Sequence, residues 1–458
     1  MVATKSDRTD RARIVGALAI LGLLTSVAAA QAPGMKPDAV KGAGVFPVTA
    51  ETSLVIRGVT GQVVVTAKPA QELRFASRAK DKSGSERVLG VWFSGTAVTI
   101  APVPGTTLPE GILRVEAPAS FAVRVESQDG KVLVDGFAGA VGIVGRGTAA
   151  RAQALTGPLD AGVEGGSLSL TNLGGMVTAR LGAGSTLVAT NLRGGLDLNS
   201  QDATFKVQGL AGACRLEARG GSGELAEFAT GGDFRSSGSA LRLTGGHGDV
   251  TVTSDAAVAF SNMAASMRFE MDGGTLRGRG NQGPVEVRAR RTEVNLEAIV
   301  GALRVEGEDL KTKLAAISGE LHLDVTRGNV VLQRSSGPVT AVIFAGDAQL
   351  LELQGEVRLE IEGGNAELSW AAITGDKDSL LENRGGDITV RFPPSAVCRV
   401  TAKSKAGRIT SDSPSIKLSA EASEAEGTLG QGKGPLIAIE ANGSIHLSGG
   451  AQAPVAPS

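Results

Sequence analysis

The fold is decided by residues 265–354, which read ASMRFEMDGGTLRGRGNQ, GPVEVRARRTEVNLEAIV, GALRVEGEDLKTKLAAIS, GELHLDVTRGNVVLQRSS and GPVTAVIFAGDAQLLELQ. The segments are equal in length, and each opens on a small residue, with apolar residues two and four positions later. Alternation of apolar and polar residues is typical of a β-strand with one buried face. A fixed period of about 18 residues indicates stacked repeats and not separate globular domains.

The pattern extends upstream with looser spacing, and we number positions within each repeat from its small residue, which is position zero. Twelve intervals between these residues have the same mean length as the regular segments; the residues are Gly139, Gly157, Gly175, Gly194, Gly212, Gly232, Gly248, Ala265, Gly283, Gly301, Gly319, Gly337 and Gly355. Positions 11, 13 and 16 are also apolar, as in Val294, Leu296 and Ile299. Each repeat therefore has two expected strands with inward residues.

A unit of about 18 residues cannot bury its apolar face alone, so repeats are expected to stack at about 4.8 Å as rungs of a rod. Parallel crossovers are strongly biased to one hand, which predicts a right-handed parallel β-solenoid, or β-helix, with irregular β caps. Pro158, Pro284 and Pro338 all fall at position one, where a corner has no ladder hydrogen bond to lose. Cys214 falls at inward position two and is expected to be a core residue, not bridged to Cys398.

Six segments are expected along the chain: a signal peptide (1–30), a linker (31–44), an N-terminal β cap with the first strands (45–138), the regular β-solenoid (139–372), C-terminal strands with a cap (373–448) and a disordered tail (449–458). Lys5, Arg8, Arg11 and Arg13 precede an apolar run that ends at an A-x-A site before Gln31. This pattern predicts export to the periplasm, the cell surface or the medium. The alternative is an uncleaved anchor helix. A charged insertion is expected over residues 375–385.

Charge and composition limit the function. Hydrophobic residues make up 42% of the chain, too many for a disordered protein, and the formal net charge is −1 with both signs spread along the chain. A nucleic-acid partner is therefore not expected, nor is membrane insertion after signal cleavage.

Several motifs resemble functional sites, but each has a simpler structural explanation. The run Gly278–Gly283 fits G-x-G-x-x-G, yet strand-like residues follow where a nucleotide site needs a helix. Residues 245–249 (GGHGD) approach a calcium turn only once, and Asp376, Asp378 and Glu382 place Leu380 where a calcium loop needs an oxygen ligand.

Three clusters of polar residues are candidates for functional sites. His322 points outward with Glu320 and Asp324, which suits a metal or an acid and base less well than an ordinary polar strand face. Five arginines are interpreted as a solvated face and not as a polyanion site; they are Arg277, Arg279, Arg288, Arg290 and Arg291. A partial ladder at one corner is expected from three asparagines that share a repeat position: Asn172, Asn191 and Asn262. No catalytic, cofactor-binding or metal-ligating residue is assigned, and no cofactor is expected.

The flanks carry a family resemblance. The signal peptide, the run ILRVEAPASFAVRVESQDGKVLVDGFAGAV, the glycine-led strands, and the closing GGDITVRFPPSAVCRVTAKSKAGRI and GPLIAIEANGSIHLSGG resemble the bacterial putative-adhesin family of secreted β-solenoid domains. The resemblance covers nearly all of residues 45–448. It implies an extracytoplasmic parallel β-solenoid and brings no binding residues with it.

The expected function is therefore a non-catalytic extracytoplasmic module, adhesin-like or structural, that displays a rigid surface to a glycan or a cell-envelope protein. Two alternatives stay open. One is a polysaccharide-degrading β-helix enzyme, which needs clustered acids in a groove shaped by long rung insertions. The other is a self-assembling structural solenoid, which needs open ends.

Overall fold

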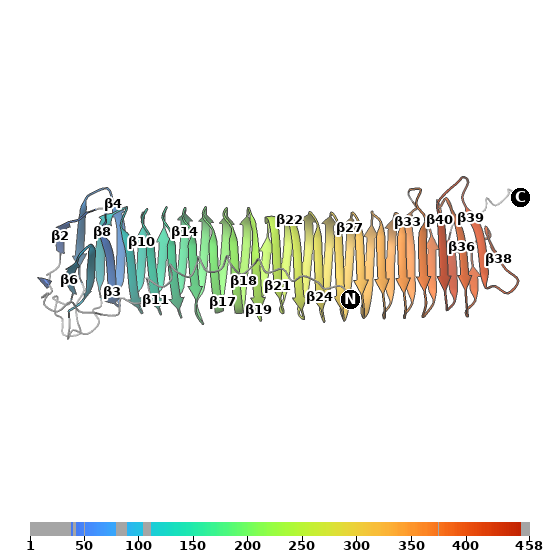
Figure 1. Ribbon diagram of the computed structural model, residues 1–458, viewed down its shortest axis with the longest axis horizontal. Coiled ribbons are helices and arrows are strands. Elements are labelled where there is room, and N and C mark those ends of the chain that lie inside the picture. The colour runs from blue at the N-terminus through green and yellow to red at the C-terminus, as the bar shows by residue number, and fades with distance from the viewer. Residues whose placement is uncertain are drawn as a thin grey trace, which may run out of the picture.

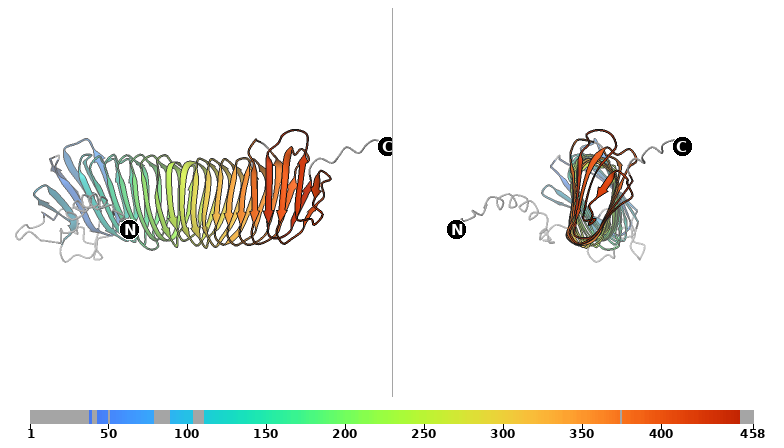
Figure 2. Two further views of the ribbon diagram at one scale, coloured as in Figure 1. Left: turned by 45° about the vertical axis from the view of Figure 1, so that its right-hand side comes forward. Right: turned by 90° about the vertical axis from the view of Figure 1, so that its right-hand side faces the viewer.

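The computed structural model describes residues 38–39, 43–49, 51–78, 89–103, 111–373 and 375–449. It confirms the predicted fold class. These residues form an all-β parallel solenoid of about 15 turns with about 18 residues per turn, and the turns follow one another along a straight rod (Figure 1). The cross-section is narrow and flattened when the rod is viewed end-on (Figure 2).

Two long sheets face each other across the rod, because each regular turn contributes one strand to each. Along the axis, sheet A contains β1 (Asp38–Ala39), β6 (Leu89–Ser94), β7 (Ala97–Pro102), β3 (Ser53–Val59), β9 (Ala122–Gln128), β11 (Val141–Arg146), β13 (Leu159–Glu164), β15 (Val177–Leu181), the first halves of β17 (Leu196–Leu210) and β18 (Cys214–Phe228), β19 (Gly231–Ser237), β21 (His247–Ser254), the second half of β22 (Val258–Asp272), β24 (Val285–Arg290), β26 (Leu303–Glu308), β28 (Leu321–Val325), β30 (Val339–Ile343), β32 (Val357–Ile361), β34 (Ser379–Asn383), β40 (Leu436–Ala441), β36 (Cys398–Ser404), β39 (Glu424–Leu429) and β38 (Ile416–Leu418).

Sheet B follows the same order of turns. It contains β2 (Ala43–Pro47), β5 (Glu72–Ser77), β8 (Ile112–Pro118), β4 (Gln62–Lys68), β10 (Lys131–Asp135), β12 (Ala149–Gln153), β14 (Ser167–Leu173), β16 (Thr186–Leu192), the second halves of β17 and β18, β20 (Ala240–Thr244), the first half of β22, β23 (Thr275–Gln282), β25 (Glu293–Val300), β27 (Leu310–Ser318), β29 (Gly328–Ser335), β31 (Ala348–Gln354), β33 (Ala366–Ala372), β35 (Ile388–Phe392), β41 (Ile445–Gly449) and β37 (Ile409–Ser411). The solenoid is thus two-sided.

The register follows the predicted repeat over most of its length. Val285 pairs with Leu303, one repeat away in sheet A, and Leu296 pairs with Leu314 in sheet B. All four side chains are at most 2% exposed. Like positions therefore stack into continuous apolar columns, which is how a thin rod buries its aliphatic residues.

One assignment in the repeat was wrong. Gly232 does not occupy position zero, because it pairs with Cys214 and Val250, which are both inward residues at position two. Thr230 takes position zero in that turn, next to Gly248. Gly232 instead leaves room for Phe234, whose ring would lie 2.9 Å from a Cβ at residue 232.

Inward glycines elsewhere are matched by phenylalanines of the preceding turn. A Cβ at Gly278 would lie 2.0 Å from Cζ of Phe260, and a Cβ at Gly223 would lie 1.8 Å from Cζ of Phe205. These phenylalanines face the same columns as the glycines and are at most 3% exposed. Each large ring thus fills the space of two turns, and the glycine beside it keeps the column close-packed.

The expected asparagine ladder exists only in part. Asn191 Nδ2 donates a hydrogen bond of 3.1 Å to Oδ1 of Asn172, but Asn262 lies further along the rod, between the turns of Gly245 and Gly280. All three asparagines have φ near +55°. Their shared position is a corner in the left-handed conformation, which asparagine tolerates better than most residues.

A longer ladder of side chains runs along another corner near the C-terminal end. Oδ1 of Asn329 accepts from the backbone N–H of Asp347, Asp347 accepts from Asn365, Asn365 from Asp387, and Asp387 from Ser444, at 2.7–3.2 Å. Each turn therefore binds the next through one side-chain oxygen. Alternation of Asn with Asp keeps carboxylates from occupying adjacent turns.

This alternation predicts the effect of Asn365→Asp. The variant would place three carboxylates on adjacent turns about 4.8 Å apart and lower the free energy of unfolding by about 1 kcal/mol at pH 7. Repulsion raises the pKa of these carboxyls in the folded state above the unfolded value of about 4, so the loss should shrink as the pH falls toward about 4 and be absent below it. Urea unfolding at both pH values measures this, and an equal loss at both would contradict it.

Both ends are closed by strands that leave the simple stacking order. At the N-terminal end β1 pairs antiparallel with β6, and β2 with β5. At the C-terminal end β36 and β38 both pair antiparallel with β39. In addition, β40 and β41 insert between the turn of β34–β35 and the turn of β36–β37, although they are the last strands of the described residues.

The charged insertion is shorter than expected. Leu359 pairs with Leu381, so this turn is longer than the regular repeat, but β34 already begins at Ser379 within the expected insertion. The expected signal peptide and the tail after Gly449 lie outside the described residues. The part of the chain that the structure describes contains no helix of the length and apolarity that a membrane crossing requires.

Candidate binding surfaces on the two sheets

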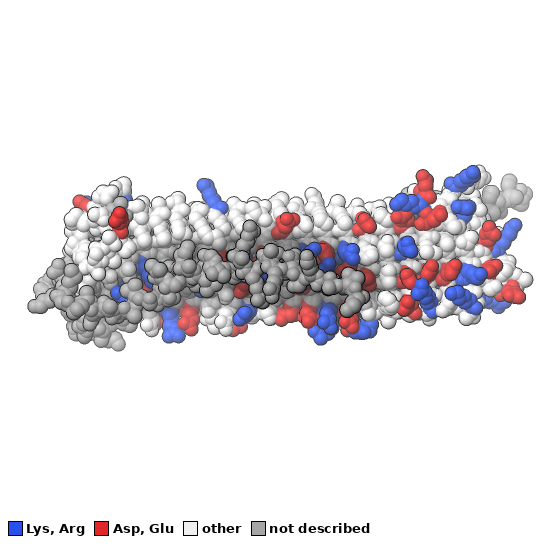
Figure 3. Space-filling model, viewed as in Figure 1, with Lys and Arg blue, Asp and Glu red and all other residues white. Residues whose placement is uncertain are grey.

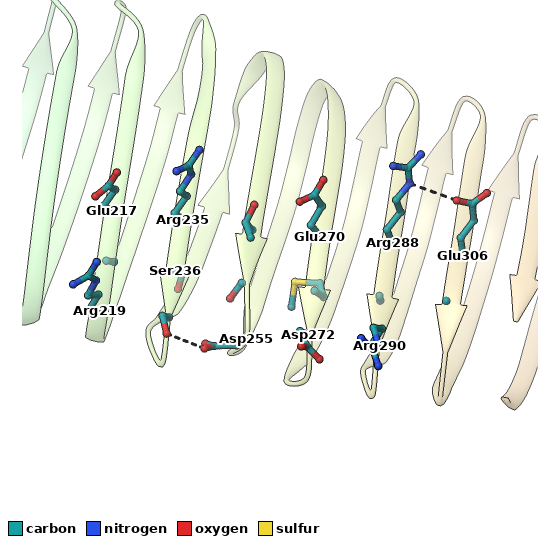
Figure 4. Close-up of a pocket in the computed structure, with 17 residues that line it drawn as sticks. Glu217, Arg219, Arg235, Ser236, Asp255, Glu270, Asp272, Arg288, Arg290 and Glu306 are labelled. Carbon is teal, nitrogen blue, oxygen red and sulfur yellow. Dashed lines mark hydrogen bonds and ion pairs between the residues drawn. The ribbon is translucent and has the colours of Figure 1, made fainter. Parts of the chain in front are cut away.

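A groove of about 950 Å³ crosses the outer face of sheet A. It spans six turns, from β18 to β26 (Figure 4). Two rows of outward side chains line it, one with Glu217, Arg235, Thr253, Glu270, Arg288 and Glu306, and one with Arg219, Ser237, Asp255, Asp272 and Arg290. We call this surface groove A.

Most charges of groove A are satisfied within the protein. Arg288 lies 2.9 Å from Glu286 and 3.5 Å from Glu306, the latter pair drawn in Figure 4. The guanidinium of Arg304 donates to Glu306 and holds the pKa of that carboxyl below its usual range. Ion pairs between exposed groups add little stability. They do, however, leave this part of the groove without excess charge.

Asp255 is the most strongly hydrogen-bonded acid of groove A. Its carboxylate accepts from the backbone N–H of Gly238 at 2.6 Å and from Oγ of Ser237 at 2.8 Å. The Gly238 N–H, followed by the Ser237 hydroxyl, lowers the pKa of Asp255. A carboxyl held in its anionic form suits anchoring the corner between two turns better than donating a proton.

The arginine cluster divides between the two sheets. Arg288 and Arg290 belong to β24 in sheet A, whereas Arg277 and Arg279 belong to β23 in sheet B. Arg290 pairs with Glu308 at 3.7 Å, Arg291 with Asp272 at 2.5 Å and Arg279 with Glu297 at 3.7 Å. The view in Figure 3 likewise shows acidic and basic side chains intermixed near the C-terminal end. The five arginines therefore do not form one stripe.

A second groove, of about 590 Å³, crosses the outer face of sheet B over β17, β18, β20, β22 and β23. Its basic residues are Lys206, Arg242 and Arg277, and small residues such as Ser222, Ala240 and Ala259 also line it. We call this surface groove B. Its charges differ from those of groove A, since Glu224 is its one acidic lining residue and pairs with Lys206 at 3.4 Å.

The basic residues of groove B form a straight row. The sheet register places Lys206, Arg242, Arg277 and Lys313 at the same repeat position, with one turn between each and the next. All four side chains are exposed. Their regular spacing, two repeats from each to the next, is visible in the sequence. It was missed because the arginines were grouped by closeness in the chain and not by position in the repeat.

His322 lies on the outer face of sheet A, as expected, between Arg304 and Thr340 of the adjacent turns. The described residues contain no group of three or more His, Cys, Asp or Glu side chains arranged to hold a metal ion. Trp370 is 4% exposed and stacks on Phe392 at 6.2 Å, so it packs in the core and offers no platform for a sugar ring.

The motif residues take structural positions. Gly278 lies within β23 and Gly283 at the corner before β24, so no helix N-terminus is present there to hold a phosphate. Residues 245–249 form another corner and the start of β21, where His247 and Asp249 are exposed. Leu380 belongs to β34 and Glu382 points outward beside Arg384 at 3.6 Å.

Both cysteines are free and buried, as expected. Burial raises the pKa of the Cys214 thiol to about 12 and that of Cys398 to about 11. A thiol acts as a nucleophile or metal ligand in its thiolate form. These two side chains therefore pack as small apolar residues.

Comparisons with known proteins were made for the sequence and for the fold. No family model matches the chain, and no curated protein sequence matches it. A solved structure that is similar is described as a "putative cell adhesion protein" from Clostridium sporogenes, with 8% sequence identity, coverage of 90% of this chain and 99% of that chain, and a TM-score of 0.14. A TM-score of that size carries no argument about function, and membership of the adhesin-like family stays a prediction.

Proposed function

We propose that this chain is a non-catalytic extracytoplasmic binding module that presents rigid rows of polar side chains to an extended partner. The observation that carries the proposal is the register: outward residues at one position stack from turn to turn in straight rows along both sheets. A rigid row loses little conformational entropy when it binds a partner, which favours a solenoid as a binding surface. Export rests on the signal-peptide pattern of residues 1–30.

The electrostatics of groove A favour binding over polysaccharide cleavage. A glycosidase needs one carboxyl with a raised pKa as its general acid. The shifts in groove A go the other way, since Asp255 and Glu306 both have lowered pKa values. The turns that line groove A also keep the short repeat, so no long insertion shapes a deep cleft around these acids.

The capped ends favour a discrete module over a filament. A solenoid that polymerises end to end needs an open strand edge at each end. At the C-terminal end, the outermost strand of sheet A is β38, which has three residues and pairs antiparallel with β39. The outermost strand of sheet B at this end is β37, which also has three residues.

Binding and turnover measured side by side test the proposal. The purified protein should bind saturably to members of a panel of cell-wall glycans, host glycans and envelope proteins, and should release no product from the glycans. Binding no higher than that of a denatured sample throughout the panel would refute a binding function. Sustained release of shorter sugars would establish the enzyme in its place.

A further inference from the structure

Sheet B carries an excess of positive charge in a chain that is otherwise nearly neutral. Over the seven turns from Thr204 to Ala315, its outward side chains include six cations and four anions. The cations are Lys206, Arg242, Arg277, Arg279, Lys311 and Lys313, and the anions are Glu224, Glu227, Glu293 and Glu297. A linear anion would therefore be attracted to this face.

Three cations of the row are available to a ligand. Arg242, Arg277 and Lys313 form no ion pair with any described residue, although most arginines of groove A do. Glu224 lies in the row itself, between Lys206 and Arg242, and pairs with Lys206 at 3.4 Å. Another acid near the row is Glu293, whose carboxylate accepts a hydrogen bond of 2.8 Å from Asn295. That bond, with the nearby charges of Arg277, Lys313 and Lys311, lowers the pKa of Glu293. The positive charges along the row therefore stabilise the carboxylate of the neighbouring Glu293.

The spacing of the row is specific. Successive cations are two turns apart, or about 9.6 Å. Groove B runs along the same row from Lys206 to Arg277. Glu224 lies between Lys206 and Arg242, and the small Ala259 leaves a trough between Arg242 and Arg277. A ligand that matches the row must be linear and must carry its negative charges at the same interval.

We propose that groove B and its basic row bind a linear acidic polysaccharide that carries a carboxylate on every second sugar. One sugar of an extended glycan advances the chain by about one turn of this solenoid, so alternate sugars match alternate turns. The inference deepens the binding function proposed above and rests on it.

Other polyanions fit the row less well. Duplex DNA carries one charge per about 1.7 Å of its axis, far denser than the row. An acidic peptide in extended conformation advances about 3.3 Å per residue, so side chains on one face recur at about 6.6 Å, out of step with the turns. Hydroxyl groups of Thr204, Ser222 and Thr275 line groove B and offer hydrogen-bond partners for sugar hydroxyls.

The test uses the purified protein and a decasaccharide of hyaluronan, in which every second sugar carries a carboxylate, with affinity measured by calorimetry at two salt concentrations. Arg242→Gln/Arg277→Gln should weaken binding by about tenfold or more and reduce its salt dependence. Glu224→Gln removes the acid of groove B and should tighten binding. Arg358→Gln/Arg399→Gln removes the same charge from exposed positions of sheet A that line neither groove, and should leave the affinity unchanged.

Two control ligands test the charge spacing. The same decasaccharide with its carboxyl groups reduced to alcohols should bind at least tenfold more weakly. A polygalacturonate decasaccharide, which carries a carboxylate on every sugar, should bind no more tightly than hyaluronan despite its greater charge.

Several results would overturn the inference. Tighter binding of polygalacturonate or single-stranded DNA would show an unspecific attraction to charge. An effect of the sheet A variant but not of the sheet B variant would place the glycan elsewhere and leave the binding function intact. If hyaluronan does not bind while another member of the glycan and protein panel does, the ligand class is wrong. If nothing binds, both proposals fail.

Discussion

Gly278→Val should lower the free energy of unfolding by about 3 kcal/mol, because overpacking a close-packed column forces the backbone or the neighbouring ring to move. The added Cβ would lie 2.0 Å from Cζ of Phe260. The ring of Phe260 cannot move away, since it stacks on the ring of Phe269 with 5.4 Å between the ring centroids. The backbone of Gly278 does not have a positive φ, so the loss reports packing and not conformational strain. Urea unfolding followed by circular dichroism measures it.

The partner substitution separates packing from other causes. Phe260→Val alone should cost about 2–3 kcal/mol, while Phe260→Val/Gly278→Val should be more stable than Gly278→Val, since the valine at 278 occupies the space the ring leaves. Gly162→Val is the matched control: its Cβ would meet no atom within 4 Å, and it should change stability by less than about 0.5 kcal/mol. Additive losses in the double variant would contradict this account of the glycine and phenylalanine columns.

These columns show where the repeat could be predicted from sequence and where it could not. Apolar residues at alternate positions, such as Leu303 and Val305, predict a strand with one inward face, because their two-residue spacing and their apolar side chains both indicate it. The same reasoning fails at Gly232, since a glycine has no side chain whose polarity would indicate an inward or an outward position. Its role appears only when Phe234 and the paired Cys214 are placed beside it. The size of a neighbour in the next turn, and not the local pattern, decides such positions.

The candidate site was less predictable than the fold for a related reason. Arg288 and Arg290 look like part of a basic cluster in the sequence, but acids from adjacent turns pair with them. Arg242 lies outside that cluster in the sequence, yet the register places it in one row with Arg277, two turns away. In a solenoid, the surface is organised across turns, so charges must be grouped by repeat position before they are interpreted.

The order of turns at the C-terminal end predicts an unusual pattern of hydrogen exchange. Chain ends normally fray and exchange their amide hydrogens first. Here β40 pairs with β34 on one side and with β36 on the other, and Ile437 and Ile439 are each 1% exposed. The amides of β40 and β41 should therefore exchange as slowly as those of central strands, at rates set by global unfolding.

The residues that precede β40 in the chain provide the matched comparison, because they form the outermost strands. β37 and β38 have three residues each, and Leu418 at the end of β38 is 42% exposed. Their amides should exchange orders of magnitude faster than those of β40, as judged by mass spectrometry of peptides from the two regions.

If instead protection decreases steadily toward the C-terminus, β40 and β41 open before β36 and β37. The cap would then be a set of strands that peel off in sequence order. Slow exchange in β40 and β41 means that the last strands of the chain lock the cap onto the rod, since neither can leave until the turn outside them has opened.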